Sequence, residues 1–275
     1  MKKNPYRIHI LGAHKAGTTK LYELISSHKA VFGSQPKQHL FFYNNSSKPE
    51  NISFNNYLNF IGYEDKEYDY VVDATPDHIF TEGCIERISE LGEECIILIS
   101  LRNPIDRAFS HWRMTNSHKK KSDFIYHITN KTKDGMSFIN RSNYYNQIKS
   151  CFEKFDRTKI HIFIFEDWVK EPGILIKHLE KITNLSLINL WDNASENTSY
   201  NNRSIRVMLK LARFININKL FSKRLRRIIR GKLITIGKKK SLSPSERQII
   251  STFFNDDVQK LKVLIGNSLN SWKDF

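Results

Sequence analysis

Residues 7–25 read RIHILGAHKAGTTKLYELI, and this segment changes character twice. Its first five residues are an apolar run typical of a short buried strand, and residues 20–25 begin an amphipathic helical pattern. Between them, residues 12–19 are small or polar and include two glycines, one lysine and two threonines. The segment therefore predicts a strand, a tight loop of the size of a phosphate group, and a helix.

The predicted loop has the chemistry of an anion-binding site. A helix N-terminus presents unpaired N–H groups and the positive end of the helix dipole to an anion. Gly12 and Gly17 allow the backbone to turn tightly and approach a ligand. Thr18 and Thr19 add hydroxyl donors, and Lys15 adds a full positive charge. A strand–turn–helix corner without a ligand also favours Gly and Thr, so the loop alone is not specific.

The loop departs from the nucleotide-triphosphatase pattern, which requires a lysine directly after the second glycine and then Ser or Thr. Here Thr18 follows Gly17, and the lysine lies earlier in the loop, at Lys15. A lysine in this place faces one phosphate and its bridging oxygen rather than the end of a triphosphate.

A second group of polar residues follows the most apolar predicted strand, residues 95–101 (CIILISL). A continuous apolar run of this kind is typical of the middle of a parallel sheet. Arg102 follows the strand, Pro104 is predicted to open a helix, and Ser110 lies about two turns along it. An arginine and a hydroxyl at this separation can both reach one further phosphate, the arginine through two parallel hydrogen bonds.

Elsewhere, predicted strands alternate with predicted helices, which favours an α/β fold with a doubly wound parallel sheet flanked by helices. We expect a single domain over residues 1–275. Other expected features are strands at 28–33, 70–73 and 160–165, loops and a short helix at 44–67, helices at 81–91, 144–155 and 172–185, a mobile basic loop at 118–133, and one final helix after a capping box at Ser243.

The chain is strongly basic, with 44 Lys and Arg against 28 Asp and Glu and a formal net charge of +16. Such a surplus favours an anionic partner: a phosphorylated cofactor, an acidic glycan, nucleic acid or a membrane surface. The charge is concentrated in a basic helical C-terminal region, residues 203–240. That region is interpreted as a solvated face, with a membrane-surface helix or an anionic-polymer groove as open alternatives.

The three cysteines are scattered and lack metal-ligand spacing, so we expect them to be buried and reduced. No signal-peptide pattern and no membrane-spanning apolar run is present in the sequence. We therefore expect a cytoplasmic protein, with peripheral association at the inner membrane surface as an open alternative. The sequence contains no signal for an oligomeric state.

Together, the two polar groups resemble those of the sulfotransferases that use 3′-phosphoadenosine 5′-phosphosulfate (PAPS), and more closely the bacterial and Golgi-type carbohydrate enzymes. Residues 12–19 are similar to their 5′-phosphosulfate loop, and residues 101–110 to their 3′-phosphate motif. Further similarity at 73–76, at 166–167 and from 253 to 272 extends it over nearly the whole chain.

The resemblance implies a P-loop-like fold, PAPS as co-substrate and no metal. It implies in-line transfer of a sulfuryl group to a hydroxyl or amine of an acceptor, a glycan or glycolipid, with Lys15 stabilising the charge that grows on the bridging oxygen. The implied cofactor-binding residues are His14, Lys15, Ala16, Gly17, Thr18 and Thr19 in the loop, Arg102 and Ser110 at the 3′-phosphate, and Tyr144, Arg203 and Lys239.

The general base is where the sequence departs from this family. Carbohydrate sulfotransferases commonly have Glu at the position of Gln38, and a glutamine side chain cannot take a proton. We expect His39 to serve instead, because an unperturbed histidine titrates near neutral pH. Asp73 and Asp77 are the alternatives, together with an acceptor that needs little assistance from a base. Many relatives also have Lys at the position of Ala74.

Three alternative functions remain. A metal-dependent kinase with an atypical phosphate loop would need a metal-binding acid, for which Asp73 is the candidate, and would leave Arg102 and Ser110 unexplained. A basic protein that binds nucleic acid or a membrane surface would use residues 203–240, but no nucleic-acid-binding signature accompanies that charge, so we expect no nucleic-acid partner. Gln38 also allows a sulfotransferase fold without turnover.

Overall fold

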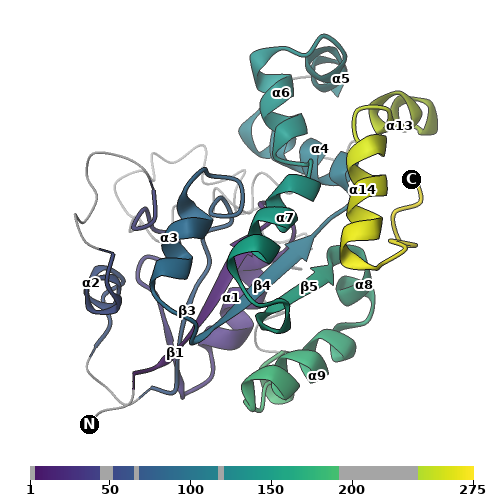
Figure 1. Cartoon of the computed structure of the whole chain (residues 1–275). Helices are drawn as coiled ribbons and strands as arrows, with labels where there is room; N and C mark the ends of the chain where they lie inside the picture. The colour runs from purple at the N-terminus through teal and green to yellow at the C-terminus, as the bar shows by residue number, and fades with distance from the viewer. Residues whose placement is uncertain (1–3, 44–51, 65–67, 117–120, 192–240) are drawn as a thin grey trace, which may run out of the picture.

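The computed structural model describes residues 4–43, 52–64, 68–116, 121–191 and 241–275. It confirms the doubly wound α/β fold: five parallel strands lie in the order β2-β3-β1-β4-β5, with helices on both faces (Figure 1). The strands are β1 (Tyr6–Gly12), β2 (Val31–Gly33), β3 (Tyr70–Asp73), β4 (Cys95–Leu101) and β5 (Ile160–Ile164).

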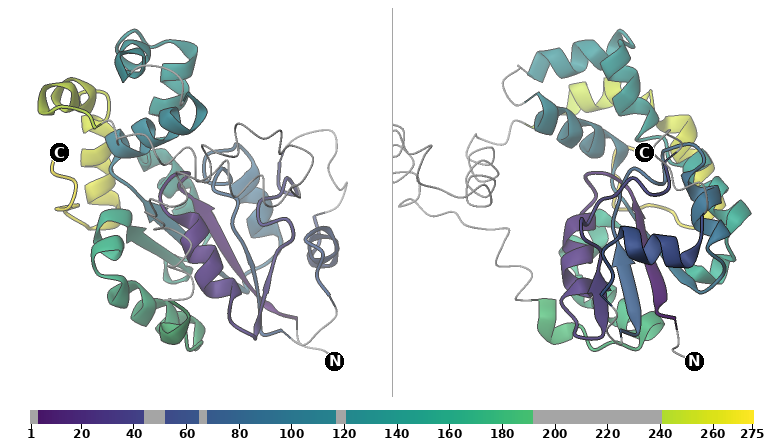
Figure 2. Two further views of the ribbon diagram at one scale, coloured as in Figure 1. Left: turned by 180° about the vertical axis from the view of Figure 1, so that it is seen from behind. Right: turned by 90° about the vertical axis from the view of Figure 1, so that its left-hand side faces the viewer.

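Alternate residues of the two central strands build two separate apolar layers, because successive side chains of a strand point to opposite faces. On one face, Ile8 and Leu98 pack with α1 (Thr18–Ser26) and α9 (Pro172–Thr183). On the other, Leu11 and Ile97 pack with α3 (Cys84–Glu90) and α7 (Tyr145–Lys154). Figure 2 shows the two helical layers on either side of the sheet. β4 is buried along its whole length, as its composition predicts.

The pairing of β1 with β4 brings the two predicted phosphate-binding groups together. Ile8 is paired with Ile96 and Ile10 with Leu98, so both strands end at the same edge of the sheet. The loop before α1 follows β1 at that edge, and α4 (Pro104–Thr115) follows β4. Ligands of open parallel sheets bind at the carboxyl ends of the strands.

Two expectations about helices were wrong. The basic segment 118–133, expected to be a mobile loop, contains α5 (Lys121–Thr129), where Phe124 and Ile128 recur at helical spacing and are buried. The final helix is divided into α13 (Pro244–Ser251) and α14 (Asn255–Ile265). The remaining helical elements are α2 (Phe54–Phe60), α6 (Lys133–Asn140), α8 (Phe165–Lys170), and the 3₁₀ turns η1 (Arg157–Lys159) and η2 (Ile188–Leu190).

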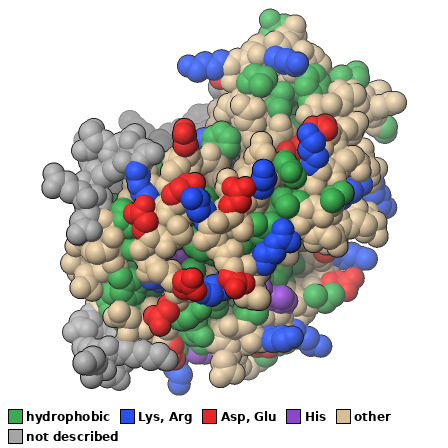
Figure 3. All heavy atoms as spheres, in the orientation of Figure 1, with side chains coloured by type: hydrophobic (Ala, Val, Ile, Leu, Met, Phe, Trp, Pro, Cys, Tyr) green, Lys and Arg blue, Asp and Glu red, His purple; other side chains and the backbone are tan. Residues whose placement is uncertain are grey.

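The expected basic region, residues 203–240, lies outside the described residues, and most of the chain's net positive charge lies outside them too. The described residues contain 24 Lys and Arg against 23 Asp and Glu, so they are nearly neutral. Figure 3 shows acidic and basic side chains interspersed on one face. The three cysteines are buried and unpaired. No helix in the described part of the chain has the length and apolar composition to cross a membrane.

Candidate functional site

The loop between β1 and α1 is held in its conformation by contacts with residues of β4 and α8. Gly17, the residue before α1, has a left-handed backbone conformation with φ of 82°. A Cβ at Gly17 would lie 2.4 Å from the ring of Trp168, so only glycine fits at this position. The Trp168 indole donates to the Ser100 hydroxyl (3.0 Å), which donates to the Ala16 carbonyl (2.6 Å). Residues of β4 and α8 therefore hold in place the loop that follows β1.

Four cationic side chains gather around this loop. Burial lowers the pKa of Lys15, and the neighbouring Arg102, Arg107 and Arg113 lower it further. Among the described residues, no carboxylate forms an ion pair with any of these four cations. The Lys15 ammonium instead lies 3.6 Å from the Met114 sulfur. Asp77 and Glu166 interact electrostatically with Arg107 and Arg102 without forming an ion pair among the described residues. Buried positive charge without a paired carboxylate is costly, so the cluster favours an anionic ligand.

Arg102 extends the cluster from the end of β4. Its guanidinium donates to the Lys15 carbonyl (3.0 Å) and lies 4.8 Å from the centre of the Phe165 ring. Ser110 lies on α4, partly exposed. Tyr144, predicted to contact the cofactor, is fully buried, and its hydroxyl donates to the Arg102 carbonyl (2.9 Å). Tyr144 therefore positions Arg102 in this structure.

The first turn of α4 is stabilised by residues far away in sequence. The Asn103 side chain caps the helix, and its backbone N–H donates to Glu166 (3.0 Å). The Asn103 amide also donates to Asp274 (2.7 Å), and Arg247 joins Asp274 to Asp106 through ion pairs. These contacts anchor the helix that carries Ser110.

Sequence reasoning missed Lys37, which lies on the other side of the loop. Its ammonium donates to the Thr19 hydroxyl at the start of α1 (2.7 Å). Burial lowers the Lys37 pKa to about 8, although Glu23 acts in the opposite direction. The signal in the sequence was the basic and aromatic segment 36–43. Lys37 gives the loop a second lysine, opposite Lys15.

The residues considered for the general base lie in different environments. Gln38 is exposed, whereas His39 is buried with its Nε2 3.6 Å from an Asp73 oxygen. That oxygen also accepts hydrogen bonds from His9 and Tyr57, both at 2.6 Å. Burial acts to raise the Asp73 pKa, but His9 and His39 hold it well below its usual range. His39 and Asp73 thus lie in the core beneath the loop.

Two further histidines lie on the loop and on α4. The rings of His14 and His111 meet edge to face, with their centroids 4.7 Å apart. Burial and the neighbouring Arg107 lower the pKa of His14 to about 4, although Asp77 acts in the opposite direction. Burial and Arg107 also lower the pKa of His111, to about 3. Both imidazoles are therefore neutral at neutral pH.

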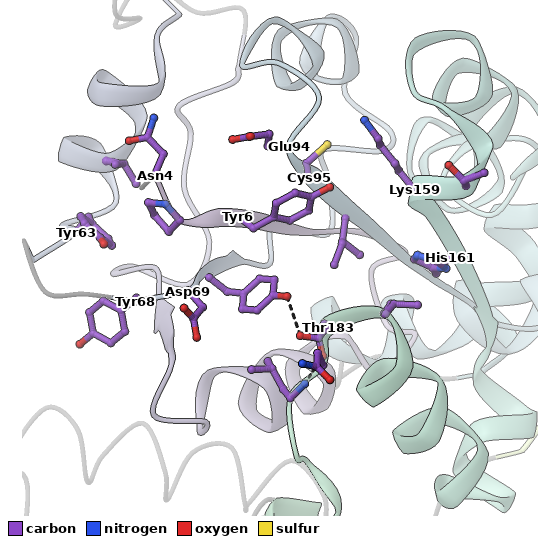
Figure 4. Close-up of a pocket in the computed structure, with 18 of the residues that line it drawn as sticks. Asn4, Tyr6, Tyr63, Tyr68, Asp69, Glu94, Cys95, Lys159, His161 and Thr183 are labelled. Carbon is purple, nitrogen blue, oxygen red and sulfur yellow. Dashed lines mark hydrogen bonds between the residues drawn. The ribbon is translucent and has the colours of Figure 1, made fainter. Parts of the chain in front are cut away.

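Two predicted cofactor contacts, Arg203 and Lys239, lie outside the described residues. The described residues contain no group of three or more His, Cys, Asp or Glu arranged to hold a metal ion. A separate hollow of about 1350 Å³ lies at the opposite edge of the sheet, near the amino ends of β1, β3 and β4 (Figure 4). It is lined by Tyr6, Tyr68 and His161 among others, and contains none of the predicted site residues.

The chain is similar to known proteins in sequence and in fold. The family model described as "Sulfotransferase domain" matches residues 5–262. The mouse and human proteins named heparan sulfate glucosamine 3-O-sulfotransferase 5 are each 24% identical over 199 residues, which cover 68% of this chain and 56% of the relative. The match thus spans little more than half the length of those relatives.

Two solved structures have a similar fold. The sulfotransferase from Alicyclobacillus acidocaldarius superposes with a TM-score of 0.61 at 18% identity, covering 98% of this chain and 99% of that one. The sulfotransferase domain of the Synechococcus PCC 7002 olefin synthase gives a TM-score of 0.50 at 12% identity, covering 91% and 95%. At these identities the likeness concerns the fold.

Proposed function

The chain belongs to the sulfotransferase domain family, and we propose that it transfers a sulfuryl group from PAPS to a hydroxyl or amine of a saccharide acceptor, a glycan or glycolipid. The observation that carries this proposal is the cluster of Lys15, Arg102, Arg107 and Arg113, which has no carboxylate partner among the described residues. It lies beside the loop that leads into the N-terminus of α1, where an anion gains hydrogen bonds and charge stabilisation together.

PAPS carries two anionic groups, and the site offers two places for them. The loop N–H groups, Lys15, Lys37 and the Thr18–Thr19 hydroxyls would hold the 5′-phosphosulfate. Arg102 and Ser110, at the end of β4 and on α4, would hold the 3′-phosphate. This division follows the strand order, because β1 and β4 are neighbours.

The proposed reaction is an in-line displacement at sulfur. The acceptor oxygen or nitrogen forms a bond to sulfur and gives its proton to a general base or to water. The bond from sulfur to the bridging oxygen breaks, and 3′-phosphoadenosine 5′-phosphate leaves. The Lys15 ammonium would stabilise the negative charge left on that bridging oxygen. Positioning and preorganised charge supply most of the acceleration in comparable phosphoryl transfers.

A saccharide acceptor is supported by the curated relatives, whose names specify a glucosamine of heparan sulfate. The test is to incubate the protein with PAPS labelled in its sulfur and pools of glycans and glycolipids, without metal. Label should enter an acceptor together with equimolar release of the bisphosphate, and Lys15→Ala should abolish both. Transfer of the γ-phosphate of ATP in the presence of magnesium, without sulfate transfer, would contradict the proposal.

A further inference from the structure

We infer that Asp77, Phe80 and Arg141, here called the acceptor rim, bind an uncharged, hydroxyl-rich unit of the acceptor in preference to an anionic one. The inference rests on the proposed function and specifies the class of acceptor. Of these three residues the sequence analysis considers only Asp77, as an alternative general base, and it gives no role to Phe80 or Arg141.

The acceptor rim borders the phosphate loop on the β3 side. The turn that carries Asp77 packs directly on the loop, since a Cβ at Gly12 would lie 2.6 Å from the Ile79 side chain. The Ile79 N–H donates to the Leu11 carbonyl (3.2 Å). This turn follows β3, which lies on the side of β1 away from β4. Because the proposed 3′-phosphate residues follow β4, the β3 side is left for the acceptor.

The other half of the rim comes from the end of α6. Arg107, one of the cations of the loop cluster, donates to the Phe138 carbonyl of α6 (2.8 Å) and to the Ser142 hydroxyl (2.6 Å). Arg141, which lies between Phe138 and Ser142 in the sequence, forms an ion pair with Asp77. The pair is close enough to the loop to act on His14, whose pKa Asp77 raises and Arg141 lowers.

The rim combines a charge-neutral polar pair with an exposed ring. The Arg141 guanidinium lies 4.4 Å from the centre of the Phe80 ring, which is 37% exposed. The side chains of Arg141 and Asp77 are 24% and 36% exposed. Among the described residues, no other side chain bonds to Arg141 Nε or Nη2, or to Asp77 Oδ2. Donors, an acceptor and an apolar surface are therefore all presented to solvent.

This arrangement suits hydroxyl groups better than anions. A sugar hydroxyl donates and accepts, so neighbouring hydroxyls can bond to the guanidinium and the carboxylate together. The exposed aromatic ring can pack against the apolar face of a sugar. A carboxylate or sulfate placed at Arg141 would instead come close to the Asp77 carboxylate, and like charges in contact repel.

Two matched acceptors test the inference. One is a tetrasaccharide of the unsulfated heparan backbone, with alternating N-acetylglucosamine and glucuronate; the other is its carboxyl-reduced form, in which glucose replaces glucuronate. Wild-type protein should have the higher kcat/KM with the reduced form. Asp77→Asn keeps the side-chain shape but removes the negative charge. It should lower the ratio of kcat/KM for the reduced form to kcat/KM for the acidic form by roughly fivefold, the scale of a partly exposed charge interaction.

The control is Asp256→Asn, which removes a carboxylate that pairs with Lys260 on the exposed surface of α14 and should leave the ratio unchanged. The inference is overturned if wild type prefers the acidic form, if Asp77→Asn leaves the ratio unchanged, or if the reduced form receives no sulfate. Binding of 3′-phosphoadenosine 5′-phosphate by the same preparation separates these results from a failure of the proposed function: without that binding, the proposed function fails and the inference fails with it.

Discussion

The Lys37 ammonium, 2.7 Å from the Thr19 hydroxyl, has a pKa lowered to about 8 by burial. It is protonated below that pH and loses its charge above it. Affinity for 3′-phosphoadenosine 5′-phosphate should therefore fall by about tenfold as the pH rises through 8, because a charge-assisted hydrogen bond is lost. Lys37→Arg keeps its charge throughout and should flatten this part of the profile. Calorimetric titration between pH 6.5 and 9.5 measures it, and equal slopes in both proteins would contradict the assignment.

His39 gives a prediction that distinguishes a general base from a buried core residue. If His39 is the base, His39→Gln should lower turnover by about 10²-fold or more, with the affinity for the bisphosphate unchanged. Glutamine keeps much of the bulk in the core, and the melting temperature checks that the fold is retained. Unchanged turnover would show that His39 is a core residue, in keeping with its 3.6 Å approach to the buried Asp73.

At the residue level, a motif that fixes both residue type and spacing allows its residues to be placed near one another from the sequence. Lys15 and Arg102 were predicted in this way, and the structure brings them together. Lys37 was missed because its proximity to Thr19 depends on how the segment after β2 folds back over α1. The position of Tyr144 beneath Arg102 also depends on packing between elements, which no local pattern records.

The turn into α1 provides a prediction at the level of an element. Gly17→Ala would place a Cβ 2.4 Å from Trp168 at a φ of 82°, so it should lower the free energy of unfolding by about 1–3 kcal/mol and weaken bisphosphate binding. Gly173→Ala on α9 is the matched control, because a Cβ there meets nothing within 4 Å. Its stability should change by less than about 1 kcal/mol. Urea unfolding compares the two, and equal effects would refute the constraint at Gly17.

The alternation of strands and helices was predictable because each strand is a short apolar run and the apolar residues of each helix recur at helical spacing. The helix α5 was not predicted, because the density of lysine and polar residues in 118–133 concealed the spacing of Phe124 and Ile128. The break between α13 and α14 was also missed. No glycine or proline marks it, and Phe254 is buried at the break by tertiary packing.

Across the whole molecule, the last residues of the chain support the site at the end of β4. Trp272 is 1% exposed, and its indole donates to Glu166 (2.9 Å), which in turn accepts the Asn103 N–H. Asp274 bonds to Asn103 from 171 residues away in sequence. Contacts over such separations leave no signal in a single sequence, so this support was not predictable, although the resemblance to the sulfotransferases extends to Trp272.

Trp272→Ala should therefore have two effects. Loss of a large buried ring lowers the free energy of unfolding by about 3–5 kcal/mol. Bisphosphate affinity should also fall at temperatures where the variant is folded, because Glu166 loses a partner beside the start of α4. Val263→Ala on α14 is the control, since Val263 is 85% exposed and should change neither property. A variant as stable as wild type would contradict the role of this segment.

The central claim is that the loop and the end of β4 bind the two phosphates of a PAPS-type nucleotide. Calorimetric titration with 3′-phosphoadenosine 5′-phosphate in the absence of metal, compared with ATP and magnesium, tests it without knowledge of the acceptor. We predict micromolar binding of the bisphosphate, lost in Lys15→Ala and in Arg102→Ala. Binding of ATP with magnesium but not of the bisphosphate would contradict the account and favour a kinase.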